Sequence, residues 1–262
     1  MAHLRCDFYS DALGLSTTMT VLLPQQTRTQ IGMTGHADSA PPPVLYLLHG
    51  LSDDDTIWLR RTSVERYAAP LGLAVVMPQV HRSFYNDQAY GGAYWTFLSE
   101  ELPALVSEFF RVSDRPEDTF VAGLSMGGYG AMRWALTYPD RFAAAASFSG
   151  AVNITGMRTR RHRSDDPRLY ERIFGEQPVP DSADVFKLLA GVDHDQCPQL
   201  YVGCGTEDGL IDDNRELVQR ITDAGLDVTT SFVPGDHEWG LWDVEINRFL
   251  DLLPLRTRDG RG

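Results

Sequence analysis

The stretch TFVAGLSMGGYGAMRWALTY, residues 119–138, decides the fold. Residues 119–122 form a short apolar run typical of a buried strand, whereas residues 128–138 are rich in Ala, Met and Leu and have helical spacing. Between them, residues 123–127 read Gly-Leu-Ser-Met-Gly and match the pattern G-x-S-x-G. A strand that enters a helix through this pattern predicts a tight, strained turn that presents the Ser125 side chain at the end of a sheet.

Further apolar runs repeat this alternation of strand and helix. The strand-like runs are residues 44–48, 73–77, 143–148, 199–202 and 228–233, and the helix-length segments are residues 94–110, 214–224 and 241–253. Runs that are apolar on both faces suit central strands, so we predict an α/β fold with a mainly parallel central sheet flanked by helices. Two strand-like runs within residues 4–23 predict an antiparallel edge, and Pro103 predicts a kink or break in the helix that begins at residue 94.

Residues 151–195 break this rhythm. They are too long for a simple connection and contain no strong strand, but residues 167–174 and 182–189 have helical spacing. We therefore expect a helical insertion that acts as a cap within a single domain of residues 1–262. Its basic run, residues 158–163, is expected to form surface salt bridges, with binding of an anionic substrate group or an acidic neighbour as the alternative.

Composition and charge limit the classes of function. The chain has a formal net charge of −13, which repels phosphate backbones and argues against nucleic acid as a partner. No window approaches about 18 consecutive apolar residues, so no membrane span is expected, and residues 1–10 lack the apolar core of a secretory signal. Because Cys6, Cys197 and Cys204 form no CxxC pair, we expect free, buried thiols and a cytoplasmic protein.

Ser125 needs a base within hydrogen-bond reach to act as a nucleophile. In folds with this turn, an acid and then a histidine follow the serine, each after a later strand. His237 follows the last predicted strand, whereas His162 and His194 fall in the insertion, so we predict His237 as the general base. Asp208 follows the strand at residues 199–202 and is predicted to orient the imidazole.

The position of the acid has alternatives. Asp208 is preferred because it follows the turn by enough residues to point back toward the last loop, and Glu207 is the main rival. Asp236 adjoins the histidine, and Asp212 and Asp213 lie after the same strand as Asp208. These remaining acids are predicted to cap the helix that begins near residue 214, where negative charge is favourable.

Two backbone N–H groups should hold the developing oxyanion. One is predicted at Met126, directly after the nucleophile, and the other in the loop at residues 49–52, after the first central strand. An HGGG motif is absent there, so Leu51 is predicted to donate through an ordinary amide.

Five segments together resemble the putative-esterase, or esterase D-like, family of α/β-hydrolases. They are LLHGL at residues 47–51, SFY at 83–85, GLSMGGYG at 123–130, GTED at 205–208 and HEW at 237–239. WLRRT at residues 58–62 and ERY at 65–67 make tributyrin esterases the most similar branch. The resemblance covers residues 4–253 and implies the α/β-hydrolase fold, the triad Ser125, Asp208 and His237, and the oxyanion donors Leu51 and Met126.

The resemblance also separates branches of the family. Those that hydrolyse S-formylglutathione usually carry a histidine where Leu124 stands here, which argues against that substrate. The insertion, from residue 153 onward, matches the family least clearly. Phe84 and Trp239 lie within or beside the motif segments, and we expect them to bind substrate.

From these observations we expect a serine carboxylesterase that hydrolyses short-chain acyl esters through an acyl-enzyme. An S-formylglutathione hydrolase or a feruloyl esterase with the same triad is the first alternative; acyl transfer and a non-catalytic binding protein are the others. The chemistry requires no cofactor, and the adjacent acids at residues 53–55 suit helix capping and solvated charge rather than a metal site. The expected partners are a small ester substrate and a second copy of the chain.

Overall fold

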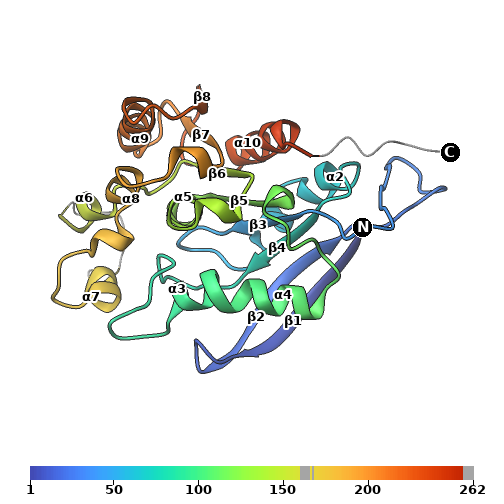
Figure 1. The fold of residues 1–262 in the computed structure, drawn as a ribbon, viewed down its shortest axis with the longest axis horizontal. Helices are drawn as coiled ribbons and strands as arrows, with labels where there is room; N and C mark the ends of the chain where they lie inside the picture. Colours follow the sequence, from blue (N-terminus) through green and yellow to red (C-terminus); the bar gives the residue numbers. More distant parts are fainter. Residues whose placement is uncertain (160–165, 167, 256–262) are drawn as a thin grey trace.

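The computed structural model describes residues 1–159, 166 and 168–255. Within them, an eight-stranded sheet has the order β1-β2-β4-β3-β5-β6-β7-β8 (Figure 1). The strands are β1 (Ala2–Ser10), β2 (Leu15–Leu23), β3 (Val44–Leu48), β4 (Ala74–Pro78), β5 (Thr119–Leu124), β6 (Ala144–Phe148), β7 (Gln199–Gly205) and β8 (Val228–Val233). Strands β3 to β8 pair in parallel, whereas β1 and β2 are antiparallel at one edge, which confirms the predicted sheet.

Strand β7 is longer than the sequence predicts. Its pattern stops at Val202, yet Gly203 and Gly205 still pair with Ser231 and Val233 of β8. The glycines are needed for close approach rather than for a turn: a Cβ at Gly203 would lie 2.2 Å from Glu245 Oε2, and one at Gly205 would lie 2.1 Å from a backbone oxygen. A glycine that ends an apolar run is therefore not always the end of a strand.

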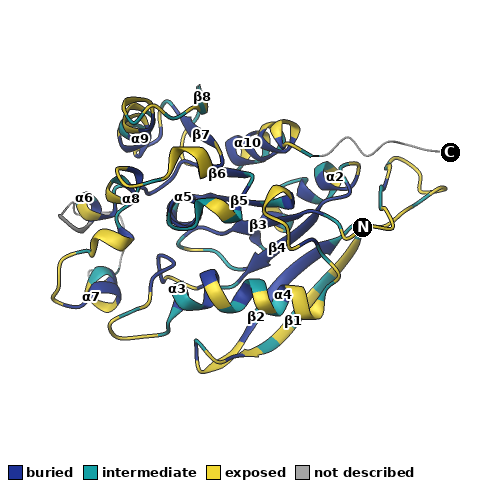
Figure 2. Ribbon diagram, viewed as in Figure 1, coloured by how far each residue is buried: buried dark blue, intermediate teal, exposed yellow. Residues whose placement is uncertain are grey.

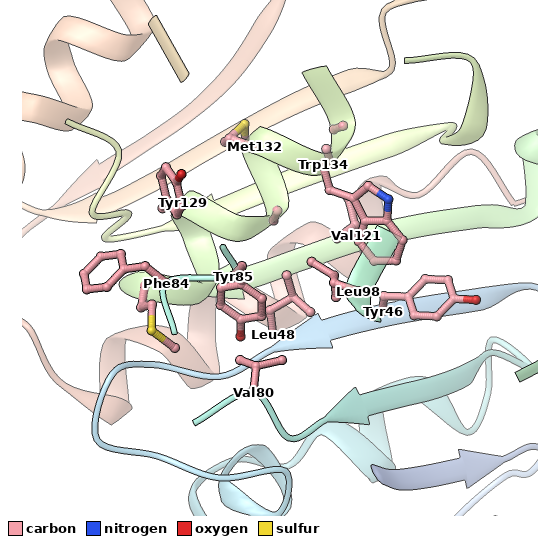
Figure 3. Packing of buried hydrophobic residues seen from close by; sticks show 14 of the residues in the cluster. Tyr46, Leu48, Val80, Phe84, Tyr85, Leu98, Val121, Tyr129, Met132 and Trp134 are labelled. Atoms are coloured by element: carbon pink, nitrogen blue, oxygen red, sulfur yellow. The ribbon is translucent and has the colours of Figure 1, made fainter. Parts of the chain in front are cut away.

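Helices cover both faces of the sheet. One face carries α4 (Leu102–Phe109), α5 (Met126–Thr137) and α9 (Ile211–Asp223), and the other carries α1 (Ile57–Arg61), α2 (Val64–Ala68) and α10 (Trp239–Leu252). The side chains of β3 alternate between the two cores, since Tyr46 and Leu48 pack on the α5 side and Leu45 and Leu47 on the other (Figure 3). Figure 2 shows that burial is greatest in the central strands and in α5.

The helical segment that contains Pro103 continues through the predicted break. It begins as α3 (Tyr94–Thr96), widens into the π-helix η1 (Phe97–Glu101) and ends as α4. Proline has no N–H to donate to the Ser99 carbonyl one turn earlier. Arg141 donates to that carbonyl instead, at 2.7 Å, so a side chain 42 residues away replaces the missing helical hydrogen bond.

The insertion forms short helices beside α5. They are α6 (Ile154–Thr159), α7 (Leu169–Phe174) and α8 (Val185–Leu189), of which the last two lie where the sequence predicts helices. Tyr129 Oη of α5 donates to the Ala183 carbonyl at 2.6 Å, and Arg133 Nε donates to the Ser182 carbonyl at 3.1 Å. The predicted basic run at residues 158–163 lies largely outside the described residues. Across those residues, no helix combines the length and the apolar character needed to cross a membrane.

Candidate active site

Ser125 lies between the end of β5 and the start of α5. Its backbone has φ 52° and ψ −115°, an unfavourable conformation for a residue with a Cβ. The turn is fixed by its neighbours, because Ser125 N–H donates to the Phe148 carbonyl at 2.8 Å and the Ser125 carbonyl accepts from Ala151 N–H at 2.9 Å. The side chain is partly exposed.

Two glycines allow this turn to form. A Cβ at Gly123 would lie 2.4 Å from the Gly127 carbonyl oxygen, and a Cβ at Gly127 would lie 2.3 Å from the Leu48 carbonyl oxygen. These separations are far below van der Waals contact. The pattern around Ser125 therefore reflects a close approach between β5, the start of α5 and the loop after β3.

His237 and Asp208 come together from two loops at the same edge of the sheet. Asp208 follows β7 and His237 follows β8, and His237 Nδ1 lies 2.8 Å from Asp208 Oδ2. The Asp208 side chain is 1% exposed, whereas that of His237 is 35% exposed. The histidine thus has one ring nitrogen held by a buried carboxylate while part of its ring remains accessible.

The surroundings of Asp208 favour its charged form. Burial alone would raise the pKa of Asp208, but its interactions with His237, the Ser149 hydroxyl and Leu210 N–H hold that pKa below its ordinary value. The Leu210 N–H donates to Oδ1 at 2.9 Å. Burial raises the pKa of the neighbouring Cys204 thiol to about 12, so this group stays protonated and can donate to the carboxylate.

Sequence reasoning missed Ser149. This residue directly follows β6 with φ 47°, is fully buried, and its hydroxyl helps to lower the pKa of Asp208. Its Oγ also accepts from Trp242 Nε1 at 3.1 Å, and the Trp242 ring packs edge-on against the His237 ring with centroids 4.8 Å apart. The only signal in the sequence is its place after a central strand, since serine there has no motif around it.

The loop after β3 contains the predicted donor Leu51. His49 Nε2 accepts from Val80 N–H at 3.1 Å, so its proton is on Nδ1, which donates to the Gly50 carbonyl at 2.8 Å. Tyr85 Oη donates to the His49 carbonyl at 2.9 Å. Neither Leu51 N–H nor Met126 N–H has an acceptor among the described residues, and Met126 is the first residue of α5.

The other candidate acids have different partners. Glu207 accepts from the Gly235 N–H and from Thr206 Oγ1, and Asp213 accepts from Asn153 Nδ2 at 3.0 Å. Asp212 and Asp213 lie in the first turn of α9, which begins at Ile211, three residues before the predicted start. Asp236 accepts from the His237 backbone N–H rather than from its ring.

The two predicted substrate-binding residues differ in exposure. Phe84 is 2% exposed and packs against Tyr129 and Tyr170, with ring centroids 6.0 and 5.7 Å apart (Figure 3). Trp239 is half-buried and stands perpendicular to Trp58 and Trp242. A cavity of about 130 Å³ lies elsewhere, lined by residues such as Tyr46 and Thr119, and none of the predicted site residues lines it.

The acids at residues 53–55 have structural partners. Asp54 accepts from Thr56 N–H at the start of α1 and from Arg60. Asp55 is buried rather than solvated, which corrects one expectation, and it accepts from Thr18 and Thr20 of β2. The thiols require a second correction, because Cys204 is buried but Cys6 and Cys197 are only half-buried.

Known proteins resemble this chain over nearly its whole length. The family model described as "Putative esterase" matches residues 10–252. An acetyl esterase of Caldicellulosiruptor saccharolyticus is 29% identical over 255 residues, which cover 94% of this chain and 96% of that protein. A fluorophosphonate-binding serine hydrolase of Staphylococcus aureus, solved with bound substrate, has a TM-score of 0.85 at 33% identity and covers 96% of this chain and 98% of that chain.

A second solved structure is similarly close. The S-formylglutathione hydrolase FrmB of Staphylococcus aureus has a TM-score of 0.82 at 33% identity, again over 96% of this chain and 98% of that chain. The match of the family model extends over most of the sheet and its helices. The chain therefore has the α/β-hydrolase fold and belongs to the family of carboxylic ester hydrolases described as "Putative esterase".

Proposed function

We propose that this chain is a serine carboxylesterase that hydrolyses short-chain acyl esters, such as those of tributyrin, through the triad Ser125, His237 and Asp208. The observation that carries the proposal is the 2.8 Å contact between His237 Nδ1 and Asp208 Oδ2, at the sheet edge where the strained Ser125 turn also lies. A histidine bonded through Nδ1 to a buried carboxylate has Nε2 free to accept a proton.

In this mechanism, Ser125 Oγ attacks the ester carbonyl carbon while His237 Nε2 takes its proton. The carbonyl oxygen becomes an oxyanion, which the N–H groups of Leu51 and Met126 stabilise. The intermediate collapses to an acyl-enzyme, and the departing alcohol oxygen receives the proton from His237. Water then attacks the acyl carbon with His237 as base, which releases the acid and restores the Ser125 hydroxyl.

Aromatic residues, net charge and cysteines support the proposed substrate class and the proposed cellular location. Trp239 offers a partly exposed aromatic surface beside Trp242, whose ring packs on His237, whereas Phe84 is buried against Tyr129. The net charge of −13 favours a neutral ester over nucleic acid as partner. The free thiols Cys6, Cys197 and Cys204 support a reducing, cytoplasmic setting.

Labelling with a fluorophosphonate tests the nucleophile. The wild-type protein should take up the label, and the Ser125→Ala variant should not. Ser147→Ala is the matched control, because Ser147 is a buried serine near the same turn whose hydroxyl has no partner among the described residues. Uptake by Ser125→Ala at the wild-type rate would show that the nucleophile lies elsewhere.

S-formylglutathione hydrolysis is the second candidate, because FrmB is 33% identical over 96% of this chain. The two candidates share the triad and differ in the acyl group, formyl or longer, and in the leaving group, a thiol or an alcohol. A comparison of kcat/KM for p-nitrophenyl acetate, p-nitrophenyl butyrate, S-formylglutathione and methyl ferulate separates them. The esterase proposal predicts the highest value with the short acyl esters, and a higher value with S-formylglutathione would favour the second candidate.

A further inference from the structure

Strand β1 forms an open edge of the sheet. It stands at one end of the strand order and pairs only with β2 (Figure 1). In the described part of the chain, no backbone group of residues 2–9 is hydrogen-bonded to a segment other than β2. Figure 2 shows the exposure along this strand, where Tyr9 is 60% exposed. One row of its N–H and C=O groups is therefore free to pair.

This edge lacks most of the features that usually prevent strand pairing. Monomeric proteins protect their edges with short strands, prolines, bulges or charged side chains, above all lysines. Strand β1 has nine residues, AHLRCDFYS, with neither proline nor lysine. Its register against β2 is unbroken from Ala2 opposite Leu23 to Ser10 opposite Leu15, so it contains no bulge.

The charges on β1 are complementary to a second copy of the same strand. Facing residues in an antiparallel pair point to the same side of the sheet, so only residues of equal parity can face each other. With a two-fold axis beside Cys6, Arg5 of each copy faces Asp7 of the other, and Leu4 faces Phe8. Arg5 and Asp7 are both exposed, with 57% and 68% of their side chains accessible.

The two neighbouring registers are less favourable in their charge pairs and in the number of residues that they pair. An axis beside Arg5 places two arginines opposite each other, and an axis beside Asp7 does the same with two aspartates, which is repulsive. Each shift also leaves residues at the strand ends unpaired, whereas the axis beside Cys6 pairs all nine residues. Charge and length thus select the same register.

We propose that β1 pairs with β1 of a second copy of this chain, in antiparallel register about Cys6, to form a two-fold dimer with one continuous sheet. Such an interface uses the same surface on both copies. The Phe8 ring packs against the Phe109 ring at 6.2 Å, and Phe109 of α4 is 43% exposed, so an apolar strip lies along the seam. The dimer is independent of the proposed esterase activity, because β1 contributes no residue to that site.

A charge-swap series tests the register. Wild-type protein should sediment at twice the 29.3 kDa chain mass at high concentration and dissociate on dilution. Arg5→Asp or Asp7→Arg converts both attractive cross-strand pairs to repulsive ones and should raise the dimer dissociation constant by at least about tenfold. The double variant Arg5→Asp/Asp7→Arg restores opposite charges and should return that constant to within about threefold of wild type.

The matched control is Arg215→Asp on α9. Arg215 is also exposed and lies 3.5 Å from an aspartate oxygen, the same distance as in the Arg5–Asp7 pair, but it is far from β1 in the sheet order. Its dissociation constant should match that of the wild type. A wild-type chain that stays monomeric up to about 200 μM, or single reversals that dimerise as well as the wild type, would overturn the proposal.

Cys6 provides a second readout that does not depend on the charge variants. At the proposed axis the two Cys6 Cα atoms would be about 4.5–5.5 Å apart, which a disulfide can span. Oxidation with copper phenanthroline should give a covalent dimer in wild type and in Cys197→Ser, and none in Cys6→Ser. A covalent dimer that persists in Cys6→Ser and disappears in Cys197→Ser would place the contact elsewhere and refute the proposal.

Discussion

Ser149 connects two residues that support the proposed triad, Asp208 and Trp242. Its hydroxyl helps to lower the pKa of Asp208, and it accepts a hydrogen bond from Trp242, whose ring packs on His237. Asp208 must hold its charge in a buried position, where each donor matters more than it would in water. A buried serine with φ 47° is also strained, and such strain persists only where the surroundings impose it.

We predict that Ser149→Ala lowers kcat about 3- to 30-fold with little change in KM, because it removes a polar group that favours the charged form of Asp208. Steady-state kinetics with p-nitrophenyl butyrate measure this. Ser149→Gly is a second test, since it also lacks the hydroxyl but relieves the strained backbone, and its kcat should fall as in Ser149→Ala. If either variant keeps the wild-type kcat, the Ser149 hydroxyl is not needed; Ser147→Ala should leave kcat unchanged.

His49 gives a pH dependence of stability. Burial lowers the pKa of His49 below its ordinary value, and its Nε2 accepts from Val80 N–H. Between the folded pKa and the ordinary value of about 6.5, the unfolded chain binds a proton that the folded chain does not. The stability from neutral His49 is therefore complete above about pH 6.5 and is lost as the pH falls toward the folded pKa.

The corresponding prediction concerns His49→Gln, which keeps an acceptor but cannot titrate. Between about pH 6.5 and 5.5, the free energy of unfolding of the wild type should fall by up to about 1 kcal/mol more than that of the variant. Urea denaturation at these pH values measures the difference. Equal pH dependence in both proteins would mean that His49 titrates normally in the folded state.

At the scale of elements, Glu245 joins α10 to β7 and β8. It is fully buried and accepts from Tyr201 Oη at 2.7 Å, from Ser231 Oγ at 2.9 Å and from Arg248 at 2.6 Å. Helix α10 begins at Trp239, directly after the His237 loop, so this network also holds in place the helix that follows that loop. A buried carboxylate with three donors is costly to disrupt, since each donor loses its partner.

We predict that Glu245→Ala lowers the free energy of unfolding by about 3–5 kcal/mol, as expected when one partner of a buried charge network is removed. The matched control is Glu216→Ala on α9, because Glu216 forms an exposed ion pair with Arg220 at the same 2.6 Å distance. That variant should lose less than about 1 kcal/mol. Similar losses in both variants would show that the burial of Glu245 contributes nothing special.

The sequence was informative wherever a local pattern determines an element. The alternating apolar runs predict the strands from β3 to β8, and the glycines around Ser125 predict its turn, because both effects act within a few residues. Contacts between distant segments were not predictable. Nothing near Pro103 indicates that Arg141 replaces its hydrogen bond, and nothing near Gly203 indicates that Glu245 occupies the space beside it. For that reason the sequence predicts neither the π-helix η1 nor the extension of β7 beyond Val202.

In the candidate site, too, local patterns are predictable from the sequence and contacts between distant segments are not. The order of Ser125, Asp208 and His237 along the chain can be read from strand ends, because parallel strands deliver their loops to one edge of the sheet. The support around them cannot, since Ser149 and Trp242 are 93 residues apart and carry no motif. The left-handed backbone of Phe84 and Tyr85 was equally hidden, because neither residue type favours it.

At the scale of the whole molecule, net charge acts on a charged substrate before it reaches the site. A net charge of −13 repels anions over distances of about one Debye length, near 10 Å at 0.1 M salt. Neutral esters do not experience this repulsion. Varying the salt concentration therefore separates the effect of the protein's net charge from the effect of groups close to Ser125.

We predict that kcat/KM for an anionic ester, such as the p-nitrophenyl ester of a dicarboxylic acid, rises about 2- to 10-fold as salt increases from about 0.02 to 0.3 M. Over the same range, kcat/KM for the neutral p-nitrophenyl butyrate should change little, which controls for effects of salt on the enzyme itself. Stopped-flow or steady-state assays at fixed pH measure both. If kcat/KM for the anionic ester falls instead, a positive group close to the Ser125 hydroxyl outweighs the net charge, and the preference for neutral esters would have to be abandoned.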